Sequence, residues 1–220
     1  MKRIGLIFIF ILLSQTAFAA QNTGFYFGFS GGYVIPQTMQ YSDPYYGADK
    51  FDTTLENGYL LSIKTGWNTP FTRRIMAMEV EYSYLNNNFD NSKVLLSSTT
   101  YDGNMSTHAV LFNIKGRYPD GPIHPYAGFG LGWAFSSVGE ITERDSGGSV
   151  IYIWPGESGG GVCWQFLAGV DIDIAPNMSL GIGYKYLAAY TSIGDDHGHG
   201  SDDNLDYRAS IITMGLNFTF

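Results

Sequence analysis

The sequence is poor in charge: only 15% of its 220 residues are charged, whereas 45% are hydrophobic and 16% are aromatic. Soluble domains carry about 25% charged residues, so this composition argues against an ordinary soluble domain. Long hydrophobic runs are also missing after the N-terminal segment, and a membrane-spanning helix needs about 20 consecutive apolar residues. Many aromatic residues without such a run indicate that apolar residues alternate with small and polar ones. That alternation is typical of a barrel with lipid outside and a polar lumen.

Cysteine is nearly absent from the sequence, because Cys163 is the only one. A single thiol cannot form an intramolecular disulfide, so no covalent cross-link stabilises the fold. We expect Cys163 to be a small packed residue rather than a reactive thiol. The lack of cysteine around residue 20 also argues against a lipid-anchored lipoprotein.

Residues 1–19 have the composition of a secretory signal peptide. Two basic residues precede the apolar run from Ile4 to Leu13, and an A-x-A site ends at Ala19. The run is roughly half the length of a membrane-spanning helix. The sequence therefore predicts export, cleavage after Ala19 or Ala20, and one outer-membrane domain over residues 21–220.

Eight segments alternate apolar with small or polar residues at a period of two, over the 9 to 11 or so residues that a tilted strand needs to cross a bilayer. They are residues 24–34, 58–67, 75–85, 106–118, 125–135, 162–173, 178–187 and 207–220. Aromatic residues cluster near the ends of the apolar faces, as the interfacial girdles of a membrane barrel require. The sequence predicts an all-β fold, an eight-stranded antiparallel up-and-down transmembrane barrel.

The connections between these segments alternate in length. Three short connections carry turn residues and lie at residues 68–70, 119–122 and 175–177. Four long connections lie near residues 35–57, 86–104, 136–161 and 188–206. Short periplasmic turns and long extracellular loops are typical of outer-membrane barrels, and an even strand number leaves both termini in the periplasm.

The hairpin over residues 166–186, FLAGVDIDIAPNMSLGIGYKY, and the closing NFTF resemble the superfamily of small outer-membrane barrels that includes the opacity proteins and the OmpA transmembrane domain. The resemblance implies this fold and a place in the outer membrane of a Gram-negative cell. Phe218 and Phe220 resemble the signal by which barrel-assembly machinery recognises its clients, so that machinery is an expected partner. Such a resemblance implies fold and location more firmly than activity.

The alternation also predicts which charged residues point into the lumen. Seven do so: Lys64, Glu79, Glu81, Lys115, Arg117, Asp171 and Lys185. Counting from the first short turn places Lys64 close to Glu79, with Lys115 on the far side of the strand that carries Glu79. Buried charges must pair, and side chains fill the interior of an eight-stranded barrel. We therefore expect these ions to plug the lumen instead of lining an open pore.

Two motifs resemble catalytic motifs of known enzymes, but their structural context does not support catalysis. Residues 28–32, GFSGG, match the G-x-S-x-G nucleophile elbow, which requires a strand-to-helix turn, but they lie inside an alternating strand. Residues 199–201 contain the H-x-S of a lipid A deacylase barrel, but in a glycine-rich loop. The sequence predicts no enzymatic activity.

The last long connection contains carboxylates and imidazoles that are able to bind a metal ion. The candidate ligands are Asp195, Asp196, His197, His199, Asp202 and Asp203. No regular element is expected to hold them in fixed positions. A solvated loop, extended by charge repulsion, is therefore the favoured interpretation, and no cofactor is expected.

The four long connections together carry a net charge of −12, while the whole chain carries −8. An acidic outer surface disfavours nucleic acid and favours cations, including divalent cations that bridge to lipopolysaccharide phosphates. Residues 37–51 and 150–154 supply exposed aromatic residues suited to recognition, although 150–154 fits an extension of the strands above the membrane slightly better. The leading hypothesis is a surface protein with a structural or interaction role and an unknown extracellular ligand. A narrow small-solute pore is the alternative, and a lipid-modifying enzyme is the third.

Overall fold

The computed structural model describes residues 24–37, 39–42, 50–53, 55–89, 100–145, 147–193 and 203–220. Regular structure in these residues is β, apart from the short 3-10 helix η1 (Pro70–Thr72). None of the described helices has the length and apolar character to span a membrane. The expected signal peptide lies outside the described residues, so it stays a prediction.

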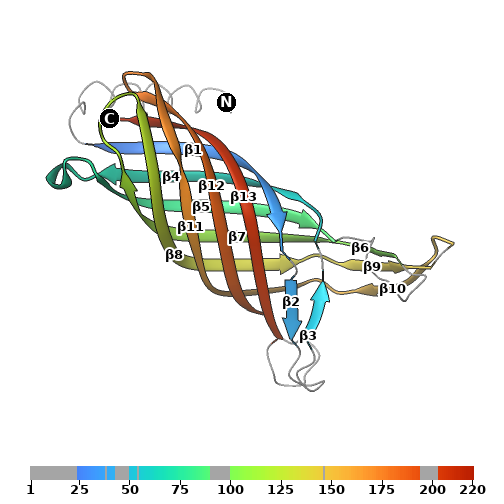
Figure 1. Ribbon diagram of the computed structural model, residues 1–220. Helices are drawn as coiled ribbons and strands as arrows, with labels where there is room; N and C mark the ends of the chain where they lie inside the picture. The colour runs from blue at the N-terminus through green and yellow to red at the C-terminus, as the bar shows by residue number, and fades with distance from the viewer. Residues whose placement is uncertain are drawn as a thin grey trace, which may run out of the picture.

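Eight long strands form a closed antiparallel barrel (Figure 1). They are β1 (Phe25–Pro36), β4 (Gly58–Asn68), β5 (Met76–Asn88), β7 (Asn104–Arg117), β8 (Ile123–Val138), β11 (Glu157–Ala175), β12 (Met178–Ile193) and β13 (Asp203–Thr219). Each strand pairs with the next in this order, and β1 closes the barrel on β13 from Tyr26↔Thr219 to Pro36↔Ala209. The predicted eight-stranded up-and-down barrel is confirmed.

The two ends of the barrel differ in their connections. At one end, here the turn end, the strands are joined through residues 69–75, 118–122 and 176–177, and the last residue lies there too (Figure 1). Gly121 in the second turn has a φ of 76°, in the left-handed region that glycine adopts without strain. The long connections lie at the opposite end, here the loop end.

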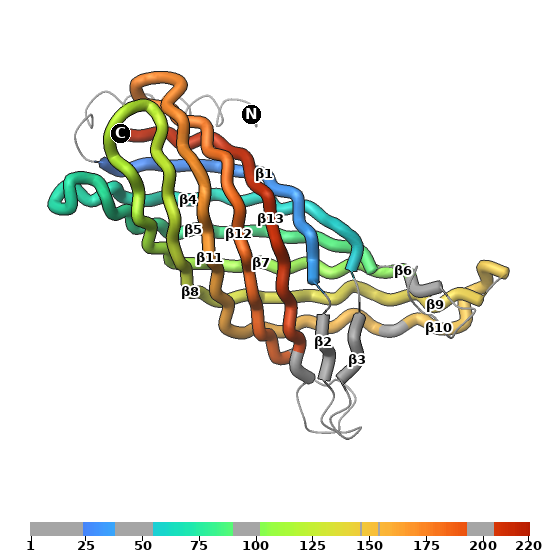
Figure 2. Tube along the Cα trace, in the orientation of Figure 1, coloured from blue at the N-terminus to red at the C-terminus, as the bar shows by residue number. Residues whose placement is uncertain are grey.

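Five short strands lie at the loop end, and four of them were not predicted from the sequence. These strands are β2 (Met39–Ser42), β3 (Lys50–Thr53), β6 (Thr100–Asp102), β9 (Ile141–Arg144) and β10 (Val150–Trp154). The β2–β3 hairpin continues the barrel sheet from β13, while β10, β9 and β6 form a separate three-stranded sheet. The β9–β10 hairpin extends beyond the barrel wall (Figure 2). The expected strand at 150–154 is therefore present, as one edge of this separate sheet.

The barrel wall follows the period of two because strand residues point alternately outward and inward. Outward side chains such as Phe29, Leu61 and Trp133 are apolar and exposed, which suits a lipid environment. Inward positions are often glycine where the lumen is crowded. A Cβ on Gly130 would clash with the side chain of Asn113, so the glycine makes room for that side chain.

The interior has two parts, stacked along the barrel axis. Near the loop end lies a core of apolar side chains, here called the apolar layer: Val34, Leu55, Leu60, Leu85, Met105, Ala109, Leu111, Ala134, Cys163, Leu187, Ala189, Leu205, Tyr207, Ala209 and Ile211. Nearer the turn end lie buried polar and charged side chains, here called the charged layer, which include Glu79, Glu81 and Lys115.

Candidate functional site

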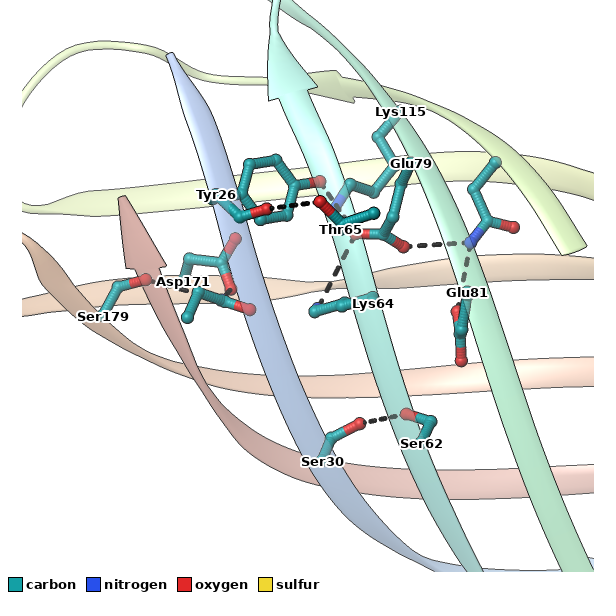
Figure 3. A network of polar contacts seen from close by, with 12 residues as sticks. Tyr26, Ser30, Ser62, Lys64, Thr65, Glu79, Glu81, Lys115, Asp171 and Ser179 are labelled. Atoms are coloured by element: carbon teal, nitrogen blue, oxygen red, sulfur yellow. Dashed lines mark hydrogen bonds and ion pairs between the residues drawn. The ribbon is translucent and has the colours of Figure 1, made fainter. Parts of the chain in front are cut away.

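The charged layer is built from inward positions on neighbouring strands. β5 contributes Glu79 and Glu81, which point inward because the residue between them, Val80, points outward with 48% of its surface exposed. β4 contributes Lys64, and β7 contributes Lys115, while other polar residues come from β1, β11 and β12 (Figure 3). The alternation thus brings charges from distant parts of the sequence into one cross-section of the lumen.

Glu79 is the centre of the first cluster and is only 2% exposed. Its carboxylate accepts hydrogen bonds from Tyr26 Oη at 2.8 Å and Asn113 Nδ2 at 2.9 Å (Figure 3). It forms ion pairs with Lys115 Nζ at 2.7 Å and with Lys64 Nζ at 3.8 Å. Lys115 carries a full positive charge and its Nζ is the closer of the two lysine nitrogens, so Lys115 is the main cationic partner of Glu79.

Glu81 is the centre of the second cluster and is fully buried. It accepts hydrogen bonds from Ser83 Oγ at 2.8 Å, Asn113 Nδ2 at 3.1 Å and Gln165 Nε2 at 3.2 Å. Lys185 Nζ forms its ion pair from across the lumen. Because Asn113 donates to both glutamates, the two clusters form one network.

The strand register alone would assign a different pairing. Lys64 lies directly opposite Glu81 in the β4–β5 ladder, but its ion pair is with Glu79, the diagonal neighbour. Glu81 is held instead by Lys185, which lies on β12. The structure thus places Lys64 and Lys115 on the two sides of Glu79, as the sequence analysis expected.

Two of the expected lumen residues, Asp171 and Arg117, lie outside the hydrogen-bonded network of Glu79 and Glu81. Asp171 is buried and accepts a hydrogen bond from Asn217 Nδ2 at 3.0 Å. Arg117 is half-buried at the turn end of β7 and forms no ion pair with any residue that the structure describes. A cavity of about 20 Å³ lies beside Lys64 and has room for about one water molecule.

The apolar layer is the part of the lumen that was not predicted from the sequence. Leu60, Leu85 and Leu187 are each 1% to 2% exposed, and Tyr207 donates a hydrogen bond from Oη to Asn87 Oδ1 at 2.9 Å. Their inward direction followed from the period of two. A comparison of inward residues by height along the barrel, rather than by strand, would have revealed the layer.

The structure also places the residues of the expected assembly signal and the serine of the GFSGG segment. Phe218 stacks on Phe29 with ring centroids 6.2 Å apart, and the backbone N–H of Phe220 donates to Phe25 O at 2.8 Å, so the chain end is part of the barrel seam. The role of Phe218 and Phe220 as an assembly signal stays a prediction. Ser30 of the GFSGG segment lies within β1, where its hydroxyl is 2.6 Å from that of Ser62.

The metal-ligand candidates lie almost entirely outside the described residues. Asp195, Asp196, His197, His199 and Asp202 are not among them, and Asp203 is the first residue of β13. In the described part of the chain, no group of three or more histidine, cysteine or acidic residues is arranged to hold a metal ion. Metal binding by this loop stays a hypothesis.

The chain belongs to a known family of barrels. Residues 6–220 match the family described as outer membrane protein beta-barrel domain, which is nearly the whole sequence. Membership agrees with the closed eight-stranded sheet and the apolar outward face, and it implies the outer membrane of a Gram-negative cell as the location.

Solved structures with the same fold include two small outer-membrane proteins. Neisserial surface protein A is 18% identical, with 90% of this chain and 98% of that chain covered and a TM-score of 0.54. The outer membrane protein OprG from Pseudomonas aeruginosa is 13% identical, with 91% and 99% covered and a TM-score of 0.53. At these identities the likeness shows the fold alone. Among curated protein sequences, none matches this chain significantly.

Proposed function

We propose that this protein is a closed outer-membrane anchor that presents its loop end to partners outside the cell. The filled lumen is the observation that carries this proposal. The charged layer and the apolar layer together occupy much of the barrel interior, and the cavity beside Lys64 has room for about one water molecule. Such filling would leave no continuous water path for a solute through the described part of the barrel.

The distribution of charge supports an extracellular loop end. The four long connections carry a net charge of −12, whereas the three short turns carry few charges. Short turns face the periplasm in outer-membrane barrels, which would leave both termini there. Divalent cations would bridge the acidic connections to lipopolysaccharide phosphates, which makes lipopolysaccharide an expected partner.

A narrow pore is the second candidate function, and one observation favours it. The charged layer contains three lysines and two glutamates, and four of these five residues line a cavity. Ion pairs that exchange partners are able to open a path. The apolar layer would also have to move. We propose no enzymatic role, because Ser30, the one serine of the elbow-like motif, lies inside a strand beside Ser62.

Conductance of the refolded protein in a planar bilayer tests the proposal. A closed anchor gives no unitary current steps, while a pore gives reproducible ones. The matched control is a variant with Leu60→Ser and Leu85→Ser, which introduces polar groups into the apolar layer without altering the ion pairs. Steady conductance by the unaltered protein would overturn the closed anchor. Protease treatment of whole cells, with cleavage in residues 43–49, would test the orientation of the loop end.

A further inference from the structure

The turn between β4 and β5, residues 69–75 and here called the arginine turn, extends from the barrel wall at the turn end (Figure 1). It carries two adjacent basic residues, Arg73 and Arg74, whose φ angles of 53° and 63° lie in the left-handed region. That backbone conformation strains a residue that has a Cβ, whereas glycine adopts it freely. Two strained arginines in succession are therefore candidates for a functional role.

Hydrogen bonds within the arginine turn hold its backbone in place. The hydroxyl of Thr69 donates to Met76 O at 2.9 Å. The backbone N–H of Arg73 donates to Pro70 O at 3.0 Å, and that of Arg74 donates to the carbonyl oxygen of Thr69 at 3.1 Å. The two arginine side chains thus extend from fixed backbone positions, so less conformational entropy is lost when they bind a ligand.

The side chains of Arg73 and Arg74 are exposed and form no ion pair with any residue that the structure describes. The three short turns contain one acidic residue, Asp120, which is exposed and is not paired with either arginine. An arginine has five N–H donors in a planar fork that matches a phosphate group. The arginine turn therefore offers unused donors to an anionic ligand.

Arg117 adds a third guanidinium group beside the arginine turn. Its backbone N–H donates to Ile75 O at 2.7 Å, and its side chain forms no ion pair within the described part of the chain. Asp173, an acidic residue at the same end of the barrel, is paired instead with His124 Nε2 at 3.0 Å. The turn end thus has unpaired cations, whereas the four long connections of the loop end carry a net charge of −12.

Aromatic rings connect the arginine turn to the lipid-facing band of the barrel. Phe25 stacks on Trp67 with ring centroids 5.8 Å apart, and Phe71 of the turn meets Trp67 edge-on at 5.9 Å. Phe71 is 71% exposed, and Ile75 is 51% exposed. Aromatic side chains of membrane barrels gather at the level of the lipid headgroups. The arginine turn is therefore continuous with the lipid-facing surface and lies near the headgroup phosphates.

We propose that the arginine turn binds the headgroup phosphate of an anionic phospholipid in the inner leaflet of the outer membrane. The guanidinium groups of Arg73 and Arg74 donate hydrogen bonds to the phosphate oxygens, and Phe71 and Ile75 contact the acyl chains. A zwitterionic lipid is attracted less, because its own cation lies beside its phosphate. The inference rests on the proposed function, because the inner leaflet follows from the periplasmic orientation of the turn end.

Quenching of tryptophan fluorescence by brominated lipids tests the proposal. A chain in which Trp133, Trp154 and Trp164 are replaced by phenylalanine keeps Trp67 alone as the reporter. It is refolded in mixed vesicles of phosphatidylcholine and phosphatidylglycerol, with one or the other lipid brominated. At low salt, we expect phosphatidylglycerol to be preferred at least about threefold around Trp67, and rising salt should weaken the preference. Equal binding of the two lipids at Trp67 would overturn the proposal.

A second reporter controls for general enrichment of anionic lipid around the barrel. It keeps Trp133 alone, which lies on β8 toward the loop end and is exposed on the outward face. We expect no preference for phosphatidylglycerol at Trp133. A preference as strong as that at Trp67 would mean that the whole barrel attracts the lipid, against the proposal.

Matched charge variants in the protein that keeps Trp67 locate the site. Arg73→Gln combined with Arg74→Gln keeps both Cβ atoms and removes two positive charges, and it should abolish the lipid preference. Arg144→Gln combined with Arg208→Gln removes the same charge near the loop end and should leave the preference unchanged. A shift in gel mobility on boiling verifies that both variants fold. Equal losses in the two variants would mean that the lipid senses net charge alone, which contradicts the proposal.

Two other occupants of the arginine turn are distinguishable. Binding of the protein to purified peptidoglycan sacculi that is lost in Arg73→Gln with Arg74→Gln, without a lipid preference at Trp67, would assign the turn to the cell wall. Displacement of brominated phosphatidylglycerol from Trp67 by a smaller amount of lipopolysaccharide would assign it to the outer leaflet. Either result overturns the proposal. Planar-bilayer conductance and protease cleavage in residues 43–49 do not depend on this lipid, so loss of the preference leaves the closed anchor and its orientation intact.

Discussion

Near the turn end, the barrel interior is filled by ions in fixed pairs, whereas near the loop end it is filled mainly by apolar side chains, with a few buried hydroxyls such as those of Thr107 and Ser136. The stability of the charged layer depends on the directions of its polar contacts, because the carboxylates of Glu79 and Glu81 each need a cation and hydrogen-bond donors at the right positions. The stability of the apolar layer depends instead on how completely its side chains fill the available volume, because close packing does not require particular partners. The interior of this barrel is therefore filled by two kinds of interaction that respond differently to mutation.

Glu79→Ala is expected to have the largest effect. It leaves Lys115 and Lys64 without their carboxylate, and removing one partner of a buried ion pair costs about 3 to 5 kcal/mol. Urea unfolding in lipid vesicles measures the loss. Glu79→Gln, which keeps the size of the side chain, separates charge from volume. A loss of about 1 kcal/mol or less would indicate that water screens the charged layer as it screens exposed pairs.

Leu85→Ala tests the apolar layer. Leu85 is 1% exposed, so truncation creates a cavity, and such changes cost about 2 to 5 kcal/mol. Leu61→Ala is the control, since Leu61 points outward from the adjacent strand and is 57% exposed. The free energy of unfolding should fall less in the control. Equal losses would show that the loop-end interior is not closely packed.

Tyr207→Phe tests a polar contact of the apolar layer. It removes the hydrogen bond from Tyr207 Oη to Asn87 Oδ1 while keeping the ring, and an unsatisfied buried acceptor costs about 1 to 3 kcal/mol. Tyr184→Phe removes a similar bond, to Ser210 Oγ at 2.9 Å, on the exposed outward face. Chemical unfolding should show a smaller change for Tyr184→Phe. The reverse order would contradict the assignment of Tyr207 to a dry layer.

Lys64→Met should have the smallest effect in the charged layer. Lys64 Nζ lies 3.8 Å from Glu79 Oε2, and Glu79 keeps Lys115, Tyr26 and Asn113 when Lys64 is lost. We expect a loss below about 1 kcal/mol, close to that of an exposed pair. Lys115→Met in the same assay should cost more. A greater loss of stability for Lys64→Met than for Lys115→Met would mean that the 2.7 Å contact between Lys115 and Glu79 does not dominate the cluster.

Much of this fold follows from the sequence because a period of two is a strong local signal. It was sufficient for the eight long strands, and it pointed Glu79 and Lys115 into one lumen. The link from Glu81 to Lys185 across the lumen depends on how the closed sheet curves, which no single strand encodes. The short strands β6 and β9 were missed because four residues or fewer contain too little of the pattern.

A double-mutant cycle on Glu79 and Lys115, read by urea unfolding in lipid vesicles, tests the central claim that the charged layer is a water-excluded plug. The variants are Glu79→Ala, Lys115→Ala and the double mutant. The 2.7 Å pair predicts a coupling energy above about 1 kcal/mol, larger than that of a parallel cycle on Glu79 and Lys64. If the stability loss of the double mutant equals the sum of the losses of Glu79→Ala and Lys115→Ala to within about 0.5 kcal/mol, the plug is contradicted.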